Sequence, residues 1–137
     1  MSDKILKMPI PYEPMKKNRW ILKFSEPFSK IQIWWLSKAS RPSYNTLDET
    51  WDDMVIVLRD PIGESTSKII LDGLAKIKNS NYEINLELEM LDPTGVVIEK
   101  WNVNGIIAKV NFGELDYIMD ESVDITMTLN VISASLV

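Results

Sequence analysis

Alternation of apolar and polar residues runs through much of the chain and predicts β-strands. Residues 84–90 show it most clearly, because every second residue is apolar and the intervening residues are Glu or Asn. Residues 19–25 and 123–131 alternate in the same way, and residues 54–59 form a β-prone run. Residues 31–36 are uncharged and β-prone as well, so we expect a strand there too.

The middle of the chain changes to a helical period. Apolar residues recur there at intervals of four and three, at Ile70, Leu74 and Ile77. A serine, Ser65 or Ser67, stands where an N-cap is needed. The pattern predicts a single short α-helix that ends near Asn79.

Turn residues divide the second half of the chain. Residues 92–95, Asp-Pro-Thr-Gly, fit a type I turn, which predicts a hairpin that returns through residues 96–103. Asn104-Gly105 indicates either another tight turn or a bulge. After it, one face of the next strand is expected to carry Ile106, Ala108, Val110 and Phe112.

Six or seven strands with one short helix predict a mainly β fold, either two packed antiparallel sheets or a small β-barrel. Residues 1–18 hold three prolines and resist helix and strand, so we expect an extended N-terminal arm. The arm either frays or lies across a neighbouring subunit. Residues 19–137 then form a single β-barrel-like domain.

Two β-prone segments lack the charges that usually protect an exposed strand edge. Residues 31–36 carry no charge, and no residue after Asp124 is charged. Their edges are paired either within one subunit or by another copy, which would make the chain an assembly unit.

Composition excludes many chemistries. The 137 residues include 15 Lys and Arg against 20 Asp and Glu, and the resulting net charge of −5 disfavours tight nucleic-acid binding. The absence of Cys and His excludes a Ser-His-Asp triad, a Cys-His pair and the usual zinc sites. Phosphate-binding glycine loops and calcium loops are also missing from the sequence. We therefore expect no enzymatic activity, no cofactor and no metal.

Targeting signals are not recognisable in the sequence. The start of the chain has only Ile5 and Leu6 as an apolar pair before Lys7, and no apolar run approaches membrane-spanning length. We expect a protein that is made and assembled in a cytoplasm and does not insert into a membrane.

Several segments, in their order along the chain, resemble the tail tube proteins of contractile-tailed bacteriophages, which are related to the type VI secretion tube protein. The resemblance covers most of the chain. The matching segments are residues 18–24, 38–44, 51, 55–61, 90–95, 99–105, 110–117 and 124–129.

The resemblance implies a β-barrel-like subunit that forms six-fold rings, which stack into a hollow tube inside a contractile sheath and conduct DNA. The implied partners are other copies, the sheath, the baseplate and tube-terminating proteins, and the implied location is the virion. Only residues 45–50 separate Tyr44 from Trp51, where the family usually has a longer excursion. A tube-initiating baseplate protein or a tube-end component therefore stays an alternative. A monomeric ligand-binding β-barrel is the alternative from another class.

An acidic or polar strand face is the first candidate site. In a tube it would line the lumen and repel phosphates, whereas in a monomer it would be a solvated outer face. The candidates for this face are Glu83, Glu87, Glu89, Glu99, Asp124, Thr126 and Thr128.

Inter-subunit contact is the second candidate role. Trp34 and Trp35 would face opposite sides of a strand, which places one in the core and the other at an interface. Arg41 would bind an acidic partner across a subunit boundary, or else be a plain exposed arginine. The candidate inter-subunit residues are Trp34, Arg41, Tyr44, Leu129 and Val131.

Overall fold

The elements follow one another along the chain with β-strands in the majority. This computed structural model describes residues 15–61, 63, 65–77, 82–118 and 120–137. The elements are β1 (Trp20–Phe24), η2 (Ile33–Trp35), β2 (Leu36–Ala39), β3 (Tyr44–Asn45), β4 (Thr50–Trp51), β5 (Met54–Arg59), α2 (Thr66–Lys76), β6 (Ile84–Leu91), β7 (Val97–Asn111) and β8 (Asp124–Leu136).

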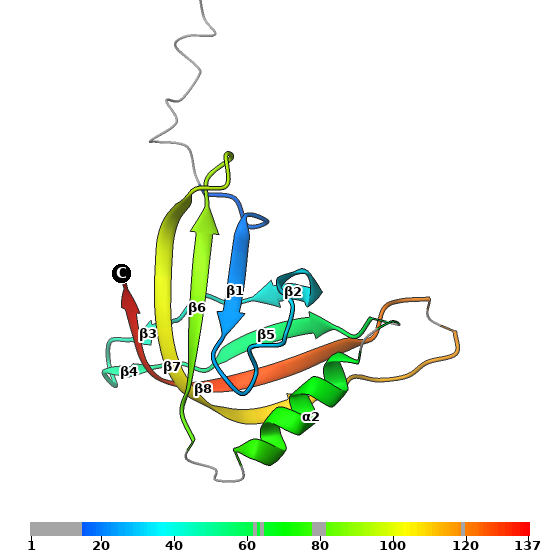
Figure 1. Ribbon diagram of the computed structural model, residues 1–137. Helices are drawn as coiled ribbons and strands as arrows, with labels where there is room; N and C mark the ends of the chain where they lie inside the picture. The colour runs from blue at the N-terminus through cyan, green and yellow to red at the C-terminus, as the bar shows by residue number, and fades with distance from the viewer. Residues whose placement is uncertain (1–14, 62, 64, 78–81, 119) are drawn as a thin grey trace, which may run out of the picture.

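A six-stranded antiparallel sheet organises the molecule, in the order β1-β6-β7-β8-β5-β2. The long strands β7 and β8 lie between two groups of strands, β1 with β6 and β5 with β2. β1 and β6 stand almost across the direction of β5 (Figure 1). The sheet thus curls into a nearly closed barrel, and β3 and β4 form a separate hairpin. The expected mainly β fold is confirmed, and the described residues contain the one short α-helix that was expected.

The Asn104-Gly105 pair marks a bulge and not a turn. β7 runs without a break from Val97 to Asn111. Asn104 pairs with Ser133 and Gly105 pairs with Val131, so Ile132 is an extra residue in β8. A Cβ atom at Gly105 would lie 2.6 Å from the carbonyl oxygen of Asn130, which explains why glycine stands where the two strands approach most closely.

A second bulge changes the face that β7 presents to the core. Ile107 pairs with Leu129 and Lys109 pairs with Thr128, which leaves Ala108 as the extra residue. Ile107 and Val110 pack against the core, whereas Ala108 is exposed. The expected alternation is therefore wrong before the bulge, where Ile107 and not Ile106 or Ala108 packs against the core, and is confirmed after it, where Val110 and Phe112 both do.

The core fills the inside of the curled sheet. Leu86 and Leu88 from β6 and Ile125 and Met127 from β8 are among its buried side chains. α2 adds Ile70, which is fully buried, so the helix packs against the sheet with the face that the sequence predicted. Apolar alternation thus correctly assigned the buried face of these strands.

Local contacts fix the start of α2. Ser65 is the N-cap, and its side chain accepts a hydrogen bond from the Lys68 N–H. The Asp60 carboxylate accepts hydrogen bonds from the Thr66 N–H at 3.0 Å and from the Ser67 hydroxyl at 2.7 Å. The helix ends at Lys76, before the predicted end near Asn79, and residues 78–81 lie outside the described residues.

Other boundaries differ from the sequence prediction. Residues 31–36 are not a strand, because η2 occupies Ile33–Trp35 and β2 begins at Leu36. β8 continues to Leu136, five residues beyond the predicted strand. Of the expected N-terminal arm, residues 1–14 lie outside the described residues.

Candidate functional site

The polar face of β6 combines two glutamates with two lysines. Lys23 Nζ lies 3.0 Å from Glu89 Oε1, and Lys100 Nζ lies 3.6 Å from Glu87 Oε2. The backbone register is the reverse, since Lys23 pairs with Glu87 and Lys100 pairs with Glu89. Each lysine therefore reaches diagonally to the next glutamate, and the four charges interleave.

This arrangement changes the electrostatics of the face. A hydrogen bond and attraction from the Glu89 carboxylate raise the pKa of Lys23, and Glu87 adds to the attraction. Because both glutamates have a lysine neighbour, the centre of the face is balanced in charge. The face is polar but is not the purely acidic wall that the sequence suggested.

Glu99 does not belong to this face. It pairs with Met90, whose side chain is buried in the molecule, and it therefore lies on the opposite side of the sheet from Glu89. Its Oε2 accepts hydrogen bonds from Arg41 Nη1 at 3.2 Å and from Trp101 Nε1 at 2.9 Å. The expected grouping of Glu99 with the β6 glutamates is wrong, because the register of the hairpin brings lysine there instead.

The remaining candidates for the polar face follow the pattern of β8. Asp124, Thr126 and Thr128 alternate with buried residues and so point away from the core. Asp124 pairs with Arg59 of β5. Glu83 is exposed immediately before β6. The non-core surface of the sheet thus carries acidic, basic and hydroxyl side chains together.

Arg41 and Tyr44 contribute to a network within their own subunit. The ring of Trp51 is 5.0 Å from that of Tyr44 and 6.3 Å from that of Trp101, both in edge-on arrangements. Through Trp101 and Glu99 this network reaches Arg41, so the partner of Arg41 lies in the same chain. Sequence gave no indication of this pairing, because 58 residues separate Arg41 from Glu99.

The other inter-subunit candidates divide into exposed and buried. Trp34 is 70% exposed, while its neighbour Trp35 is buried, so one tryptophan is in the core as predicted. Leu129 and Val131 are buried in the core. β8 lies between β7 and β5, and the interpretation of Leu129 as a residue on an open edge is therefore wrong.

The open edges of the sheet belong to β1 and β2. Among the described residues, no strand pairs with the outer side of either one. Backbone hydrogen bonds from Leu91 N to the Arg19 oxygen and from Ser25 N to the Asn85 oxygen tie the ends of β1 to β6. Residues of an antiparallel strand alternate in the direction of their backbone groups. The N–H and C=O groups of every second residue from Trp20 therefore point towards the unpaired side of β1.

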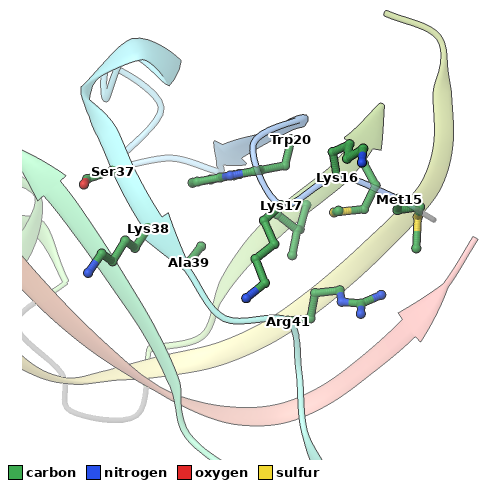
Figure 2. A pocket seen from close by; sticks show the side chains of 10 residues that line it. Met15, Lys16, Lys17, Trp20, Ser37, Lys38, Ala39 and Arg41 are labelled. Carbon is green, nitrogen blue, oxygen red and sulfur yellow. The ribbon is translucent and has the colours of Figure 1, made fainter. Parts of the chain in front are cut away.

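A groove of about 580 Å³ lies between these two edges. Figure 2 shows the Trp20 ring extending from β1 towards β2, and Lys17 extending towards the segment that carries Arg41. Leu88 and Met90 line it from β6. We call it the basic groove; it is lined by Met15, Lys16, Lys17, Trp20, Ser37, Lys38, Ala39, Arg41, Leu88 and Met90.

A loop between β7 and β8 carries the opposite charge. Residues 113–122, which we call the acidic loop, contain four carboxylates and no Lys or Arg. Leu115 is 88% exposed and Ile118 is 90% exposed, and Tyr117 is fully exposed. The sequence carries a signal for this contact surface, because apolar residues stand between the acids.

Comparison of the fold with solved structures gives matches over nearly the whole chain. A chain of an extracellular contractile injection system, the PVC sheath–tube complex in its extended state, matches with a TM-score of 0.69 at 14% identity, covering 92% of this chain and 93% of that one. A chain of the six-fold symmetrised anti-feeding prophage baseplate matches with a TM-score of 0.64 at 13% identity, covering 91% and 96%. A chain of the anti-feeding prophage tube-terminating cap matches with a TM-score of 0.66 at 12% identity, covering 100% and 99%.

The chain has the fold of contractile injection system components. No protein-family model and no curated protein sequence matches it. The agreement therefore lies in the backbone arrangement, while most side chains differ. Within the described part of the chain, no helix is long and apolar enough to cross a membrane.

Proposed function

We propose that this chain is a structural, non-enzymatic subunit of the tube of a contractile tail, in which rings of six copies stack into a hollow tube. The observation that carries the proposal is the pair of open edges, β1 and β2, in a sheet that is otherwise paired through its centre. An exposed edge presents unpaired N–H and C=O groups, with which a strand of another chain can pair. The fold shared with chains of a sheath–tube complex supports this role.

In such a tube, the non-core face of the sheet would line the lumen. The interleaved Lys23, Glu87, Glu89 and Lys100 give DNA no continuous basic surface. The carboxylates among them repel phosphates, so DNA would pass without adhering. Sheath, baseplate and tube-terminating proteins would contact the outer surface and the ends of the tube, and the assembled particle would be the virion.

A tube-initiating or tube-end component is the second candidate. It is favoured by the similarity to chains of baseplate and cap structures and by the short β3–β4 hairpin, with its tip at Leu47, which offers little surface for gripping the next ring. A component of this kind would form one ring and stop. A tube-body subunit would elongate.

Size-exclusion chromatography with light scattering, followed by negative-stain microscopy, tests these roles on the purified chain. Long hollow rods are expected for a tube-body subunit. Isolated rings that do not lengthen with concentration would instead support the tube-end role. A monomer at every concentration, with saturable binding of a small molecule, would contradict both and favour a ligand-binding barrel.

A further inference from the structure

Two surfaces of this chain complement each other in charge and in apolar character. The basic groove carries Lys16, Lys17, Lys38 and Arg41, and none of the described residues that line it is a carboxylate. Among the described residues, only Arg41 of these four has a carboxylate within 4.0 Å, which belongs to Glu99. The other three cations have no carboxylate partner in the described part of the chain, so they can bind an acidic partner.

The floor of the groove is apolar. Trp20, Leu88 and Met90 line it, and its volume of about 580 Å³ is within the range of about 300–1,000 Å³ that is typical of pockets for small ligands. A partner that fills it should therefore offer large apolar side chains flanked by carboxylates. A purely acidic partner would leave the floor in contact with water.

The acidic loop has this combination. Its four carboxylates, at Glu114, Asp116, Asp120 and Glu121, flank three highly exposed apolar or aromatic side chains, at Leu115, Tyr117 and Ile118. The base of the loop is fixed, because the Gly113 N–H donates to Asn111 Oδ1 at 2.9 Å and a Cβ atom at Gly113 would lie 2.5 Å from the Asp124 oxygen. The loop thus projects from a defined point at the end of β7.

Within one chain the two surfaces are far apart. Figure 1 shows the acidic loop, in orange, between the end of β7 and the start of β8, away from the start of β1. The groove is lined by residues 15–17 and Trp20 at the start of β1. The loop of a chain therefore does not reach its own groove. A second copy of the chain carries the same loop, so no different protein is needed to supply it.

Residues 1–14 of the chain are a less suitable occupant by composition. They contain two lysines, one aspartate and one glutamate, so their formal side-chain charge is zero. The acidic loop, with four carboxylates and no cation, is the better match to the three lysines of the groove.

We propose that the acidic loop of one copy inserts into the basic groove of a second copy, with its apolar side chains against the groove floor and its carboxylates against Lys16, Lys17 and Lys38. The contact is head-to-tail, so it closes into a ring or continues along a stack, depending on the rotation between copies. The inference rests on the proposed function, because it requires the copies to assemble.

Reciprocal charge reversal tests the contact. The groove variant carries Lys16→Glu, Lys17→Glu and Lys38→Glu, and the loop variant carries Asp116→Lys, Asp120→Lys and Glu121→Lys. In each variant alone, loop and groove have the same sign, and we expect the assembled fraction to fall by at least about tenfold. In a one-to-one mixture every loop meets a groove of opposite sign, so assembly should return to within about twofold of the wild type.

Matched controls carry charge reversals elsewhere. Lys30→Glu with Lys68→Glu, and Asp52→Lys with Asp53→Lys, change exposed residues outside both surfaces and should leave assembly within about twofold of the wild type. Circular dichroism and thermal unfolding of each variant distinguish a folding defect from an assembly defect. Rods from the single variants that equal those of the wild type would overturn the loop–groove contact and leave the tube function standing.

Engineered cysteines test the contact even if no rod forms. The chain has no native cysteine, so Lys38→Cys with Asp116→Cys introduces the only two thiols. With a short bis-maleimide, we expect covalent dimers and higher multimers, at least about tenfold more abundant than from Lys38→Cys with Asp48→Cys. Multimers without rods would support the contact and contradict the tube. Crosslinks within single chains, or equal yields from both pairs, would overturn the contact.

Discussion

The centre of the sheet and its edges differ in how completely strand pairing and side-chain burial are achieved within one chain. β8 pairs with β5 on one side and with β7 on the other, and its side chains at Ile125, Met127 and Leu129 are fully buried. β2 pairs only over Leu36–Ala39 with β5, through an irregular register, and leaves its other side open within the described structure. The centre is therefore complete in a monomer, whereas the edges keep unpaired backbone groups, which a partner would complete in the proposed assembly.

This contrast separates stability from assembly. Substitutions at the centre should unfold the chain, because they remove packing that the chain supplies to itself. Substitutions at the edges, the groove and the acidic loop should leave folding intact and change association. The same chemical change at a central and a peripheral position is therefore the sharpest comparison.

Leucine truncation should show the largest effect. Leu129→Ala removes a fully buried side chain and should lower the free energy of unfolding by about 2–5 kcal/mol. Leu115→Ala is the matched control, because Leu115 is 88% exposed, and it should change that free energy by less than about 0.5 kcal/mol. Chemical denaturation measures both. Equal losses would contradict the assignment of centre and periphery, while weaker assembly of folded Leu115→Ala would support the loop contact.

Glycine substitution is the next test of the centre. Gly105→Ala places a Cβ atom 2.6 Å from the Asn130 carbonyl oxygen. It should lower the free energy of unfolding by about 1–3 kcal/mol, because the carbonyl can move away only if the whole strand shifts. Gly63→Ala meets no atom within 4 Å and should be close to neutral. Thermal unfolding of the two variants distinguishes them, and an unchanged Gly105→Ala would mean that the bulge is more open than described.

Proline scanning separates the two sides of β2. The Ser40 N–H donates to the Val55 oxygen at 3.1 Å, so Ser40→Pro should lower stability by about 1–3 kcal/mol. The Ala39 N–H faces the open edge, because antiparallel residues alternate in direction. Ala39→Pro should therefore fold and yet assemble poorly. A folded Ala39→Pro that forms normal rods would show that this edge is not used.

A pH titration should give the smallest effect. Asp92 accepts hydrogen bonds from the Thr94 hydroxyl at 2.7 Å, the Thr94 N–H at 2.8 Å and the Val96 N–H at 2.9 Å. These bonds, the Thr94 side chain first, lower the pKa of Asp92 below its usual 3.8. Their stabilisation is complete above that value and is lost as the pH falls through the lower folded pKa.

Denaturation at pH 7 and near pH 2 measures this loss. Asp92→Asn should be less stable than the wild type at pH 7, and the difference should shrink at low pH. The control Asp53→Asn, at an exposed carboxylate, should stay near the wild type at both values. A difference that does not depend on pH would show that the Asp92 charge is not involved.

The sequence by itself determined the elements whose signal is local. Strict alternation placed β6 and the first part of β8, and four-and-three spacing with a serine cap placed α2. Both signals depend on residues a few positions apart, so they need no knowledge of the fold. They also predicted the buried face of each element, because burial follows from the same periodicity.

Only the tertiary structure decided the features that depend on strand register and on the order of the strands in the sheet. The Asn104-Gly105 pair left a turn and a bulge open, and only the pairing of β7 with β8 decided for a bulge at Ile132; no local pattern marks the second bulge at Ala108. The registers of β6 with β1 and with β7 placed Lys23 and Lys100 beside Glu87 and Glu89. The register with β7 also placed Glu99 on the side of Arg41, 58 residues away in the sequence. The position of β8 at the centre, and of β1 and β2 at the edges, likewise follows from long-range pairing, because every strand can pair on two sides and only the whole fold selects its neighbours.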